Sequence, residues 1–395
     1  MLAVSMGQTH LIRDDQEALE VADHFARQIE AESADRDKYQ RLPFLEMELF
    51  SQTGLLGMTV PKSYGGPGVS TVTFVKAVAL ISSADASLGQ IPQNHYANIE
   101  EIRLVGTEAQ KTFFFRRILQ GDRLGNAAVE RSGKSVLENQ TRLVPNGDGY
   151  LLNGEKFYCT GALYAHWVPV RTVDPEGNRV VAIVNRQSEG LTVIDDWSSF
   201  GQRTTASGTV LLRNVRVSND QILRSFQAYT KATTRGPFSQ IIHVAIDAGI
   251  AQAALKETAR FLRIDSALDE GSKTQDPLTI YEFGELQCRL HAAEALMERA
   301  AEAIDRANAS ESHESISSAA IAVAEAKVAT TEVAISTTNK LFELVGPESL
   351  REKYGLDRHW RNARVHTLHD PVRWKYYAVG NFYLNGVDPP RHAWI

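Results

Sequence analysis

Apolar residues recur at intervals of three and four positions along the first third of the chain, and this spacing predicts amphipathic helices. The clearest helical segments are residues 14–31, 43–53, 72–82 and 96–105. Closely spaced glycine and proline residues interrupt the pattern at 61–68, where a loop is expected. We therefore expect an N-terminal helical domain over residues 1–123.

The pattern changes in the middle of the chain, where short β-rich runs alternate with turn sequences. These runs are residues 149–157, 180–184, 191–194 and 209–217, and they lie between Asn-Gly, Glu-Gly and Asp-Pro-Glu-Gly turns. Regular strands separated by such turns predict an antiparallel sheet or small barrel. Because strands and helices do not alternate here, a doubly wound nucleotide-binding fold is disfavoured. The expected middle β domain covers residues 124–220.

Long alanine-rich segments with few breakers follow the predicted sheet. Residues 243–265, 281–308 and 315–345 predict three helices, with a shorter helical tail after them. Helices of this length favour an antiparallel bundle. The C-terminal domain is therefore a predicted helical bundle over residues 221–395, and the fold class is α+β.

Composition narrows the function classes. The chain has 395 residues and a formal net charge of −6, so it lacks the basic footprint of a nucleic-acid-binding protein. It has no run of the ~18–20 unbroken apolar residues that a membrane span requires, and its first 15 residues do not resemble a secretory signal. Two cysteines cannot form a disulfide framework. We expect a cytoplasmic protein with neither nucleic acid nor membrane as a partner.

The most informative segment is the tail motif His-Thr-Leu-His-Asp-Pro at 366–371. His366 and His369 are three residues apart, so they would share a face on a helical turn. Asp370 follows, and Pro371 biases it out of the helical region. Two imidazoles and a carboxylate can shuttle a proton or bind an oxygen species, or they can simply cap a helix. A metal site is the weaker interpretation because no matching third ligand is visible.

Three further positions carry candidate chemistry. On a strand, Tyr158 and Thr160 would point to the same face and supply one ring and one hydroxyl, although half-buried strand packing explains the pattern equally well. Trp197 could flank a planar ligand or fill a core. Cys159 is expected to be a small buried residue, because no histidine follows it at a recognisable spacing.

Several segments together resemble the acyl-CoA dehydrogenase superfamily. They are the loop at 60–66, the strand at 208–217, and the motifs at 85–89, 125–127, 159–162, 201–208 and 366–371. Within the superfamily the chain is most similar to the flavin-dependent monooxygenase branch, which includes dibenzothiophene monooxygenase. The closing segment at 383–394 resembles the SfnB family of sulfur-acquisition oxidoreductases. This resemblance implies a helical domain, a β-barrel or sheet domain and a C-terminal four-helix bundle.

The resemblance also implies a flavin site built from the sheet and the tail. The residues implied to bind the flavin are Asn126, Val129, Glu130, Tyr158, Thr160, Trp197, Val345, Gly346 and His369. The residues implied to act in catalysis are His369, His366, Asp370, Thr160 and Asn126. Among these, His369 is expected to contact the flavin and its oxygen adduct.

Departures from the dehydrogenase pattern favour FMN over FAD. Asp370 stands where dehydrogenases have a glutamate base, and residues 271–276 lack the segment that binds the FAD adenosine. Monooxygenase relatives have an arginine near position 267 for the FMN phosphate, whereas this chain has Ala267. Candidate substitutes for that arginine are Arg260, Arg263 and Lys273.

Substrate-pocket positions differ from dibenzothiophene monooxygenase as well. Gln90 and Asn94 replace its histidine and tyrosine, while His95 and Asn98 are retained. The identity of the substrate is therefore left open.

The leading hypothesis is a two-component monooxygenase that receives reduced FMN from a separate reductase and transfers oxygen from O₂ to sulfur in a small organosulfur compound. One alternative is an acyl-CoA dehydrogenase with Asp370 as base, and another is a flavin-binding scaffold without catalysis. The family resemblance implies a homotetramer. The alanine-rich faces of 243–265 and 315–345 would pack either between subunits or within one bundle.

Overall fold

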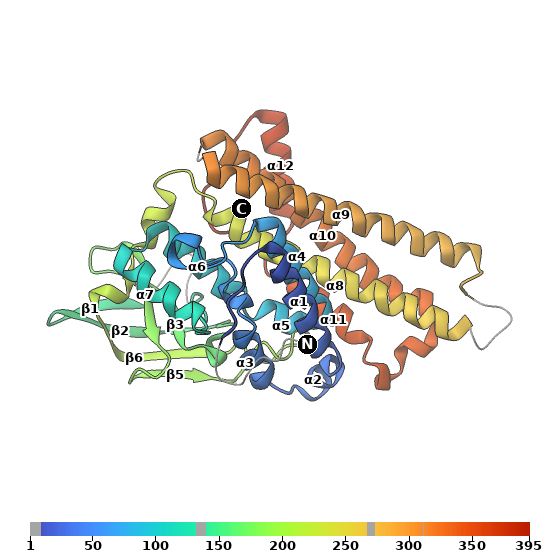
Figure 1. Cartoon of the computed structure of the whole chain (residues 1–395), viewed down its shortest axis with the longest axis horizontal. Coiled ribbons are helices and arrows are strands. Elements are labelled where there is room, and N and C mark those ends of the chain that lie inside the picture. The colour runs from blue at the N-terminus through green and yellow to red at the C-terminus, as the bar shows by residue number, and fades with distance from the viewer. Residues whose placement is uncertain (1–8, 132–139, 267–272, 311) are drawn as a thin grey trace.

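The computed structural model describes residues 9–131, 140–266, 273–310 and 312–395, in the predicted order of helices, sheet and helices (Figure 1). In Figure 1 the sheet lies at one end of the molecule and the long C-terminal helices extend toward the other. The N-terminal helices lie between them, where α4 packs on α1, α8 and α9.

The helices before the sheet follow the predicted periodicity. They are α1 (Asp15–Glu30), α2 (Ser33–Tyr39), α3 (Phe44–Gln52), α4 (Thr71–Ala84), α5 (Ala86–Gln90), α6 (Gln93–Val105) and α7 (Glu108–Leu119). The four predicted helices are confirmed as α1, α3, α4 and α6. Side chains cap the first turns of α1 and α4: Asp14 accepts from the Glu17 N–H at 2.9 Å, and the Ser70 hydroxyl accepts from the Thr73 N–H at 3.2 Å.

The middle of the chain forms one mixed sheet. Its strands are β1 (Arg142–Asn146), β2 (Gly149–Lys156), β3 (Trp167–Val173), β4 (Arg179–Asn185), β5 (Leu191–Ile194), β6 (Thr209–Val217) and β7 (Ile222–Leu223), in the order β5-β6-β2-β1-β3-β4-β7. The predicted strands are confirmed as β2, β4, β5 and β6. A wholly antiparallel sheet was the wrong expectation, because β1 and β3 are parallel, with Arg142 opposite Val173. β1 escapes a pattern search because it is mostly exposed and contains Pro145.

Three long helices and two shorter ones complete the chain. They are α8 (Arg235–Ser266), α9 (Pro277–Ser310), α10 (His313–Val345), α11 (Asp357–His366) and α12 (Arg373–Asn385). The three predicted long helices are therefore confirmed. Of the helices that the structure describes, α8 alone is long and apolar enough to cross a membrane, over Arg235–Ile264. Since 94% of its most apolar window is buried inside the molecule, its apolar character is that of a core helix.

One buried carboxylate joins the three parts of the fold. Glu101 on α6 accepts from Arg171 on β3 at 2.6 and 2.9 Å and from Arg235 on α8 at 2.9 Å. Burial disfavours the charged carboxylate, but the two guanidinium groups outweigh burial and lower the pKa of Glu101 to about 2. Glu101 thus holds the sheet and the long helices against the N-terminal helices through charge-assisted hydrogen bonds.

This arrangement predicts a loss of stability in acid. A carboxyl group whose pKa is lowered on folding stabilises the native state above its unfolded pKa of ~4.3, and that contribution is lost as the pH falls toward about 2. We expect Glu101 to contribute about 3 kcal/mol to the free energy of unfolding across this window. Urea unfolding at a series of pH values measures the slope, which should be shallower in Glu101→Gln. An unchanged slope in that variant would exclude this role.

Candidate functional site

The structure brings four predicted residues together beside the sheet. The Asn126 side-chain amide donates to the Tyr158 carbonyl at 3.4 Å, and the Tyr158 and Trp197 rings meet edge to face at 6.1 Å. The Thr160 hydroxyl lies 2.7 Å from that of Ser207. The site therefore has two aromatic rings, one amide and a pair of hydroxyls within one group, defined here as the sheet-side group.

The expected strand geometry of Tyr158 and Thr160 was wrong. β2 ends at Lys156, and Tyr158 lies in the irregular segment after it, with a φ of 53°. The two side chains consequently differ in environment, since Tyr158 is 61% exposed and Thr160 only 7%. The Tyr158 ring is thus available at the surface, while the Thr160 hydroxyl is buried. Two residues on the same face of a regular strand would not differ in this way.

Left-handed backbone conformations cluster in the segments that carry this group. Gln202 and Ala206 have φ values of 44° and 45°, close to that of Tyr158. Residues other than glycine adopt such angles at a cost of order 1–3 kcal/mol, and these angles often mark functional sites. The segment 202–207 is fixed by its own bonds, because the Thr205 hydroxyl lies 3.1 Å from the Gln202 carbonyl and 2.8 Å from the Ser207 hydroxyl.

Gln202 connects the sheet-side group to the helix that precedes the histidine tail. Its backbone N–H donates to Asn362 Oδ1 on α11 at 2.6 Å, and its carbonyl accepts from the Trp197 indole at 3.0 Å. His366 lies one helical turn after Asn362, at the end of α11. The sheet-side group and the histidine tail are therefore held in register through one hydrogen-bonded segment.

The two predicted histidines occupy different environments. α11 ends at His366 and His369 lies in the following turn, but both rings pack against the ring of His243, at centroid distances of 5.2 and 4.0 Å. His366 is buried, with Nδ1 on Asp247 Oδ1 at 2.5 Å and Nε2 at 3.1 Å from His243 Nδ1. The His369 side chain is 39% exposed. Of the two, only His369 can reach a ligand, and His366 supports the site from behind.

Asp370 is held as a carboxylate. It is buried, and its Oδ2 lies 3.5 Å from His369 Nδ1. Burial raises the pKa of Asp370, but His369 and the nearby Lys375 and Lys327 outweigh burial and hold the pKa below its ordinary value. A carboxylate stabilised in this way is a weak base, which makes Asp370 a partner that orients His369.

Three of these side chains offer metal-ligand atoms close together. Atoms of His243, His369 and Asp370 lie within 4.8 Å of one another. However, Lys327 and Lys375 are near enough to affect the pKa values of both His243 and Asp370. Two ammonium groups disfavour a divalent cation, so the arrangement is better suited to hydrogen bonding.

Other predicted site residues lie apart from the exposed histidine or are already engaged. The Glu130 carboxylate accepts from Lys156 at 2.6 Å and the Thr141 hydroxyl at 2.7 Å, which leaves only its backbone for a ligand. Val129 forms an isolated bridge with Phe157. Val345 and Gly346 end α10, where the Val345 carbonyl accepts from Lys273 Nζ at 2.6 Å.

Several sequence predictions concern residues near these groups. Cys159 is buried, and burial raises the pKa of its thiol to about 12, so the expectation of an inert cysteine is confirmed. His95 is buried between the Leu56 carbonyl and the Leu124 N–H, which assigns it a structural role. Ala267 lies outside the described residues, as do residues 271 and 272.

The sequence interpretation missed the buried support of the histidine tail. His243 and Asp247 on α8, with Lys327 on α10, form this support. A signal was present, because His243 and Asp247 are polar residues four apart within the otherwise apolar stretch 241–251 of α8. Charged residues at such positions are almost never buried without a partner, so the pair predicts a buried polar cluster.

Comparison with known proteins identifies what the chain resembles. Residues 13–122 match the acyl-CoA dehydrogenase N-terminal domain family, and residues 241–374 match the acyl-CoA dehydrogenase C-terminal domain family. The chain is 31% identical to dibenzothiophene monooxygenase of Rhodococcus erythropolis, over 95% of each chain. Its structure is similar to that of FMN-bound TdsC from Paenibacillus sp. A11-2, with a TM-score of 0.89, 31% identity, and coverage of 96% of this chain and 100% of that one. It is also similar to methanesulfinate monooxygenase MsuC from Pseudomonas fluorescens, with a TM-score of 0.88, 27% identity, and coverage of 95% and 99%.

Proposed function

Because the chain belongs to the acyl-CoA dehydrogenase superfamily, in its flavin-dependent monooxygenase branch, we propose that it uses reduced FMN and O₂ to oxygenate the sulfur of a small organosulfur compound. One oxygen atom enters the substrate and the other leaves as water, with two electrons supplied by reduced FMN. The relatives with this activity act on dibenzothiophene and methanesulfinate, which are the substrate classes to test first.

The observation that carries the proposal is the placement of His369. It is the partly exposed member of an otherwise buried polar cluster, and Asp370 lies at its Nδ1. This geometry leaves Nε2 of His369 for a reacting group. Oxygen transfer to sulfur requires a donor that supplies a proton to the departing oxygen, and a positioned imidazole is the commonest such group.

The residues of the sheet-side group fit a flavin ring. A planar heterocycle needs flat walls and hydrogen-bonding groups at its edge. Tyr158 and Trp197 supply the walls, while the Asn126 amide and the Thr160 hydroxyl supply the polar groups. When bound, the reduced flavin supplies the electrons that activate O₂.

Three cations of the chain are candidates to bind the FMN phosphate. Arg260 is bonded to Glu257 at 2.8 Å, and Lys273 is bonded to the Val345 carbonyl. Arg263 lies in the last turn of α8 and is exposed. We keep these three cations as the candidates that replace the arginine found in relatives.

Some residues of the chain position the reacting groups, and one transfers a proton. Asp370 holds the His369 ring through Nδ1, and Nε2 of His369 donates a proton to the oxygen that leaves as water. Asn126 and Thr160 hold the flavin edge and nearby oxygen atoms by hydrogen bonds.

The proposal is tested by mixing the protein with enzymatically reduced FMN, ¹⁸O₂ and either dibenzothiophene or methanesulfinate. Mass spectrometry should detect a product that carries one ¹⁸O atom per turnover. Reactions without protein or with FAD in place of FMN serve as controls. If reduction of a dye by an acyl-CoA with FAD is observed while no sulfur compound gains oxygen, the proposal is wrong.

The two alternatives are weaker on structural grounds. An acyl-CoA dehydrogenase would need Asp370 as base, but its neighbours stabilise the charged carboxylate and so weaken it as a proton acceptor. A scaffold without catalysis would not need a buried polar support behind a partly exposed histidine. Failure of the protein to retain FMN at micromolar concentration would favour the scaffold.

We propose further that the enzyme is cytoplasmic, receives reduced FMN from a separate reductase, and acts as a homotetramer. The alanine-rich face of α8 is buried within one chain, so it does not supply the interface. α12 instead exposes Trp374, Tyr377 and Leu384, which are 60%, 63% and 84% exposed and lie along one face of the helix. Exposed apolar stripes of this kind are typical of subunit interfaces.

A single substitution tests this interface. Leu384→Glu places a charge in the α12 stripe and is expected to shift the protein from tetramer toward smaller species, as measured by light scattering after size exclusion. Glu314→Gln, on the surface of α10, is the control and should leave the mass unchanged. A monomeric wild-type protein would contradict the interface outright.

A further inference from the structure

A chain of hydrogen bonds runs behind His369 and begins at a buried ion pair. Asp247 on α8 binds Lys327 on α10 through Oδ2 at 2.5 Å, and the same oxygen accepts from the Thr331 hydroxyl at 3.0 Å. Its other oxygen, Oδ1, faces His366 Nδ1. His366 Nε2 faces His243 Nδ1 at 3.1 Å. All five side chains are buried.

The charge of Asp247 determines which group donates and which accepts in each of these hydrogen bonds. Burial disfavours the Asp247 carboxylate, but Lys327 and His366 outweigh burial and hold the pKa of Asp247 below its ordinary value. An ionised carboxylate only accepts hydrogen bonds, so His366 carries its proton on Nδ1. Burial lowers the pKa of His366, although Asp247 opposes the shift, so the ring is neutral and its Nε2 is an acceptor.

The same reasoning determines the tautomer of His243. Its Nδ1 faces the acceptor nitrogen of His366 and must therefore carry the proton. Burial, followed by the neighbouring His369, lowers the pKa of His243 well below the ordinary value, so this ring is neutral too. Its Nε2 consequently has a lone pair and no proton. The tautomer of His243 is thus determined by a carboxylate that it does not touch.

The tautomer matters because His243 lies against the site. Its ring centroid is 4.0 Å from that of His369, and atoms of His243, His369 and Asp370 lie within 4.8 Å of one another. A His243 Nε2 without a proton cannot donate to Asp370. The Asp370 carboxylate is therefore left to the Nδ1–H of His369.

We propose that Asp247 is a positioning residue that, through the tautomers of His366 and His243, reserves the Asp370 carboxylate for His369. This inference rests on the proposed oxygenation, in which His369 is the proton donor. The charged and titratable groups around the His369–Asp370 pair are His366 at the end of α11, His243 on α8, Lys327 on α10, Lys375 on α12 and His392 in the final segment.

Asp247→Asn is a nearly isosteric test. Lys327 and Thr331 donate to Oδ2, and a lysine ammonium has no acceptor, so the remaining oxygen of the amide stays with them. The NH₂ group then faces His366 Nδ1, which becomes an acceptor and moves the proton to Nε2. His243 responds by carrying its proton on Nε2, from where it competes with His369 for Asp370.

The first readout needs no flavin. Nitrogen NMR of protein labelled with ¹⁵N-histidine should show protonated Nδ1 and unprotonated Nε2 for His243 in the wild type, with signals assigned by single histidine variants. Asp247→Asn should reverse that pattern. Thr330→Val, which removes a buried hydroxyl bonded only within α10, is the control and should keep it. A wild-type His243 with its proton on Nε2 overturns the proposal even if the variant fails to fold.

The second readout is the fraction of consumed O₂ that appears in product. We expect Asp247→Asn to lower this fraction about tenfold, with the KM for the sulfur substrate unchanged because Asp247 touches no substrate. A folded variant with wild-type coupling would overturn the inference. If the wild-type protein forms no oxygenated product, the proposed function fails instead, and the tautomer measurement still stands.

Discussion

Replacement of His369 by alanine is expected to lower product formation by two to four orders of magnitude while the protein still binds FMN. A positioned acid or base contributes roughly 10²- to 10⁴-fold to a rate. His369 is the member of the buried cluster that reaches the surface, and Asp370 orients its ring. The measurement is product formed per O₂ consumed, together with hydrogen peroxide released. Peroxide should account for nearly all of the O₂ in the variant.

The competing dehydrogenase hypothesis predicts a different ranking of variants. There, Asp370→Ala should abolish activity and His369→Ala should be mild. In a monooxygenase, Asp370→Ala should mainly release the His369 ring, with a smaller loss than His369→Ala. His291→Ala, on the exposed surface of α9, controls for loss of an imidazole. Equal coupling in His369→Ala and wild type would exclude His369 as the proton donor.

The helices and most strands could be predicted because their patterns are local. α1 buries one regular face, α4 is apolar and buried on nearly every side, and both have capping side chains, so their bounds are encoded within the segments themselves. β1 pairs with β2, the next strand in sequence, and β7 pairs with the distant β4, but neither β1 nor β7 shows an alternating pattern of its own. The parallel pairing of β1 with β3 likewise depends on the whole sheet, which no local window describes.

The residues of the site also fall into two kinds, those that a local motif marks and those that only the tertiary structure brings in. His369, Thr160 and Asn126 could be singled out because motifs mark them. His243, Asp247 and Lys327 could not be joined to His366 from spacing, since they lie on other helices. His243 and Asp247 are 123 and 119 residues away from His366 in sequence, and Lys327 is 80 residues away from Asp247. Motifs therefore find the groups that meet a ligand, whereas tertiary packing determines which groups hold them in place.

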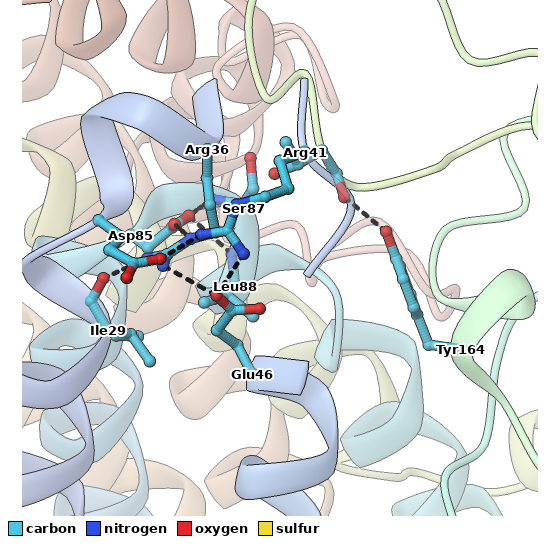
Figure 2. A network of polar contacts seen from close by, with 10 residues as sticks. Ile29, Arg36, Arg41, Glu46, Asp85, Ser87, Leu88 and Tyr164 are labelled. Atoms are coloured by element: carbon cyan, nitrogen blue, oxygen red, sulfur yellow. Dashed lines mark hydrogen bonds and ion pairs between the residues drawn. The ribbon is translucent and has the colours of Figure 1, made fainter. Parts of the chain in front are cut away.

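A second buried network lies among the N-terminal helices, and Figure 2 shows its polar contacts. Arg36 on α2 is 1% exposed and donates to Asp85 Oδ2 at 3.0 Å, to Glu46 Oε1 at 3.1 Å and to the Ile29 carbonyl. Asp85 caps α5 by accepting from the N–H groups of Ser87 and Leu88 at 3.0 and 3.1 Å. α5 in turn offers its Ala86 carbonyl to the side chain of Gln202 at 3.4 Å. Arg36 thus holds the helix against which the site segment rests.

Arg36→Met should therefore destabilise the protein by about 3–5 kcal/mol, because it leaves the Asp85 carboxylate buried without its cation and Glu46 with Arg41 alone. Burial already raises the pKa of Asp85, with Arg36 opposing the shift, and removal of Arg36 raises it further. A carboxyl group whose pKa is raised on folding stabilises the native state when protonated. The loss of stability in Arg36→Met should therefore shrink as the pH falls from 8 toward about 5.

Arg41→Met is the matched control: Arg41 donates to the same Glu46 oxygen at 3.2 Å, but its side chain is 43% exposed, so the loss of stability should stay within about 1 kcal/mol. Urea unfolding of the three proteins at both pH values measures the differences. Equal losses in the two variants would show that burial of the Arg36 pair contributes nothing beyond a surface contact, and the support of α5 would then have to come from apolar packing alone.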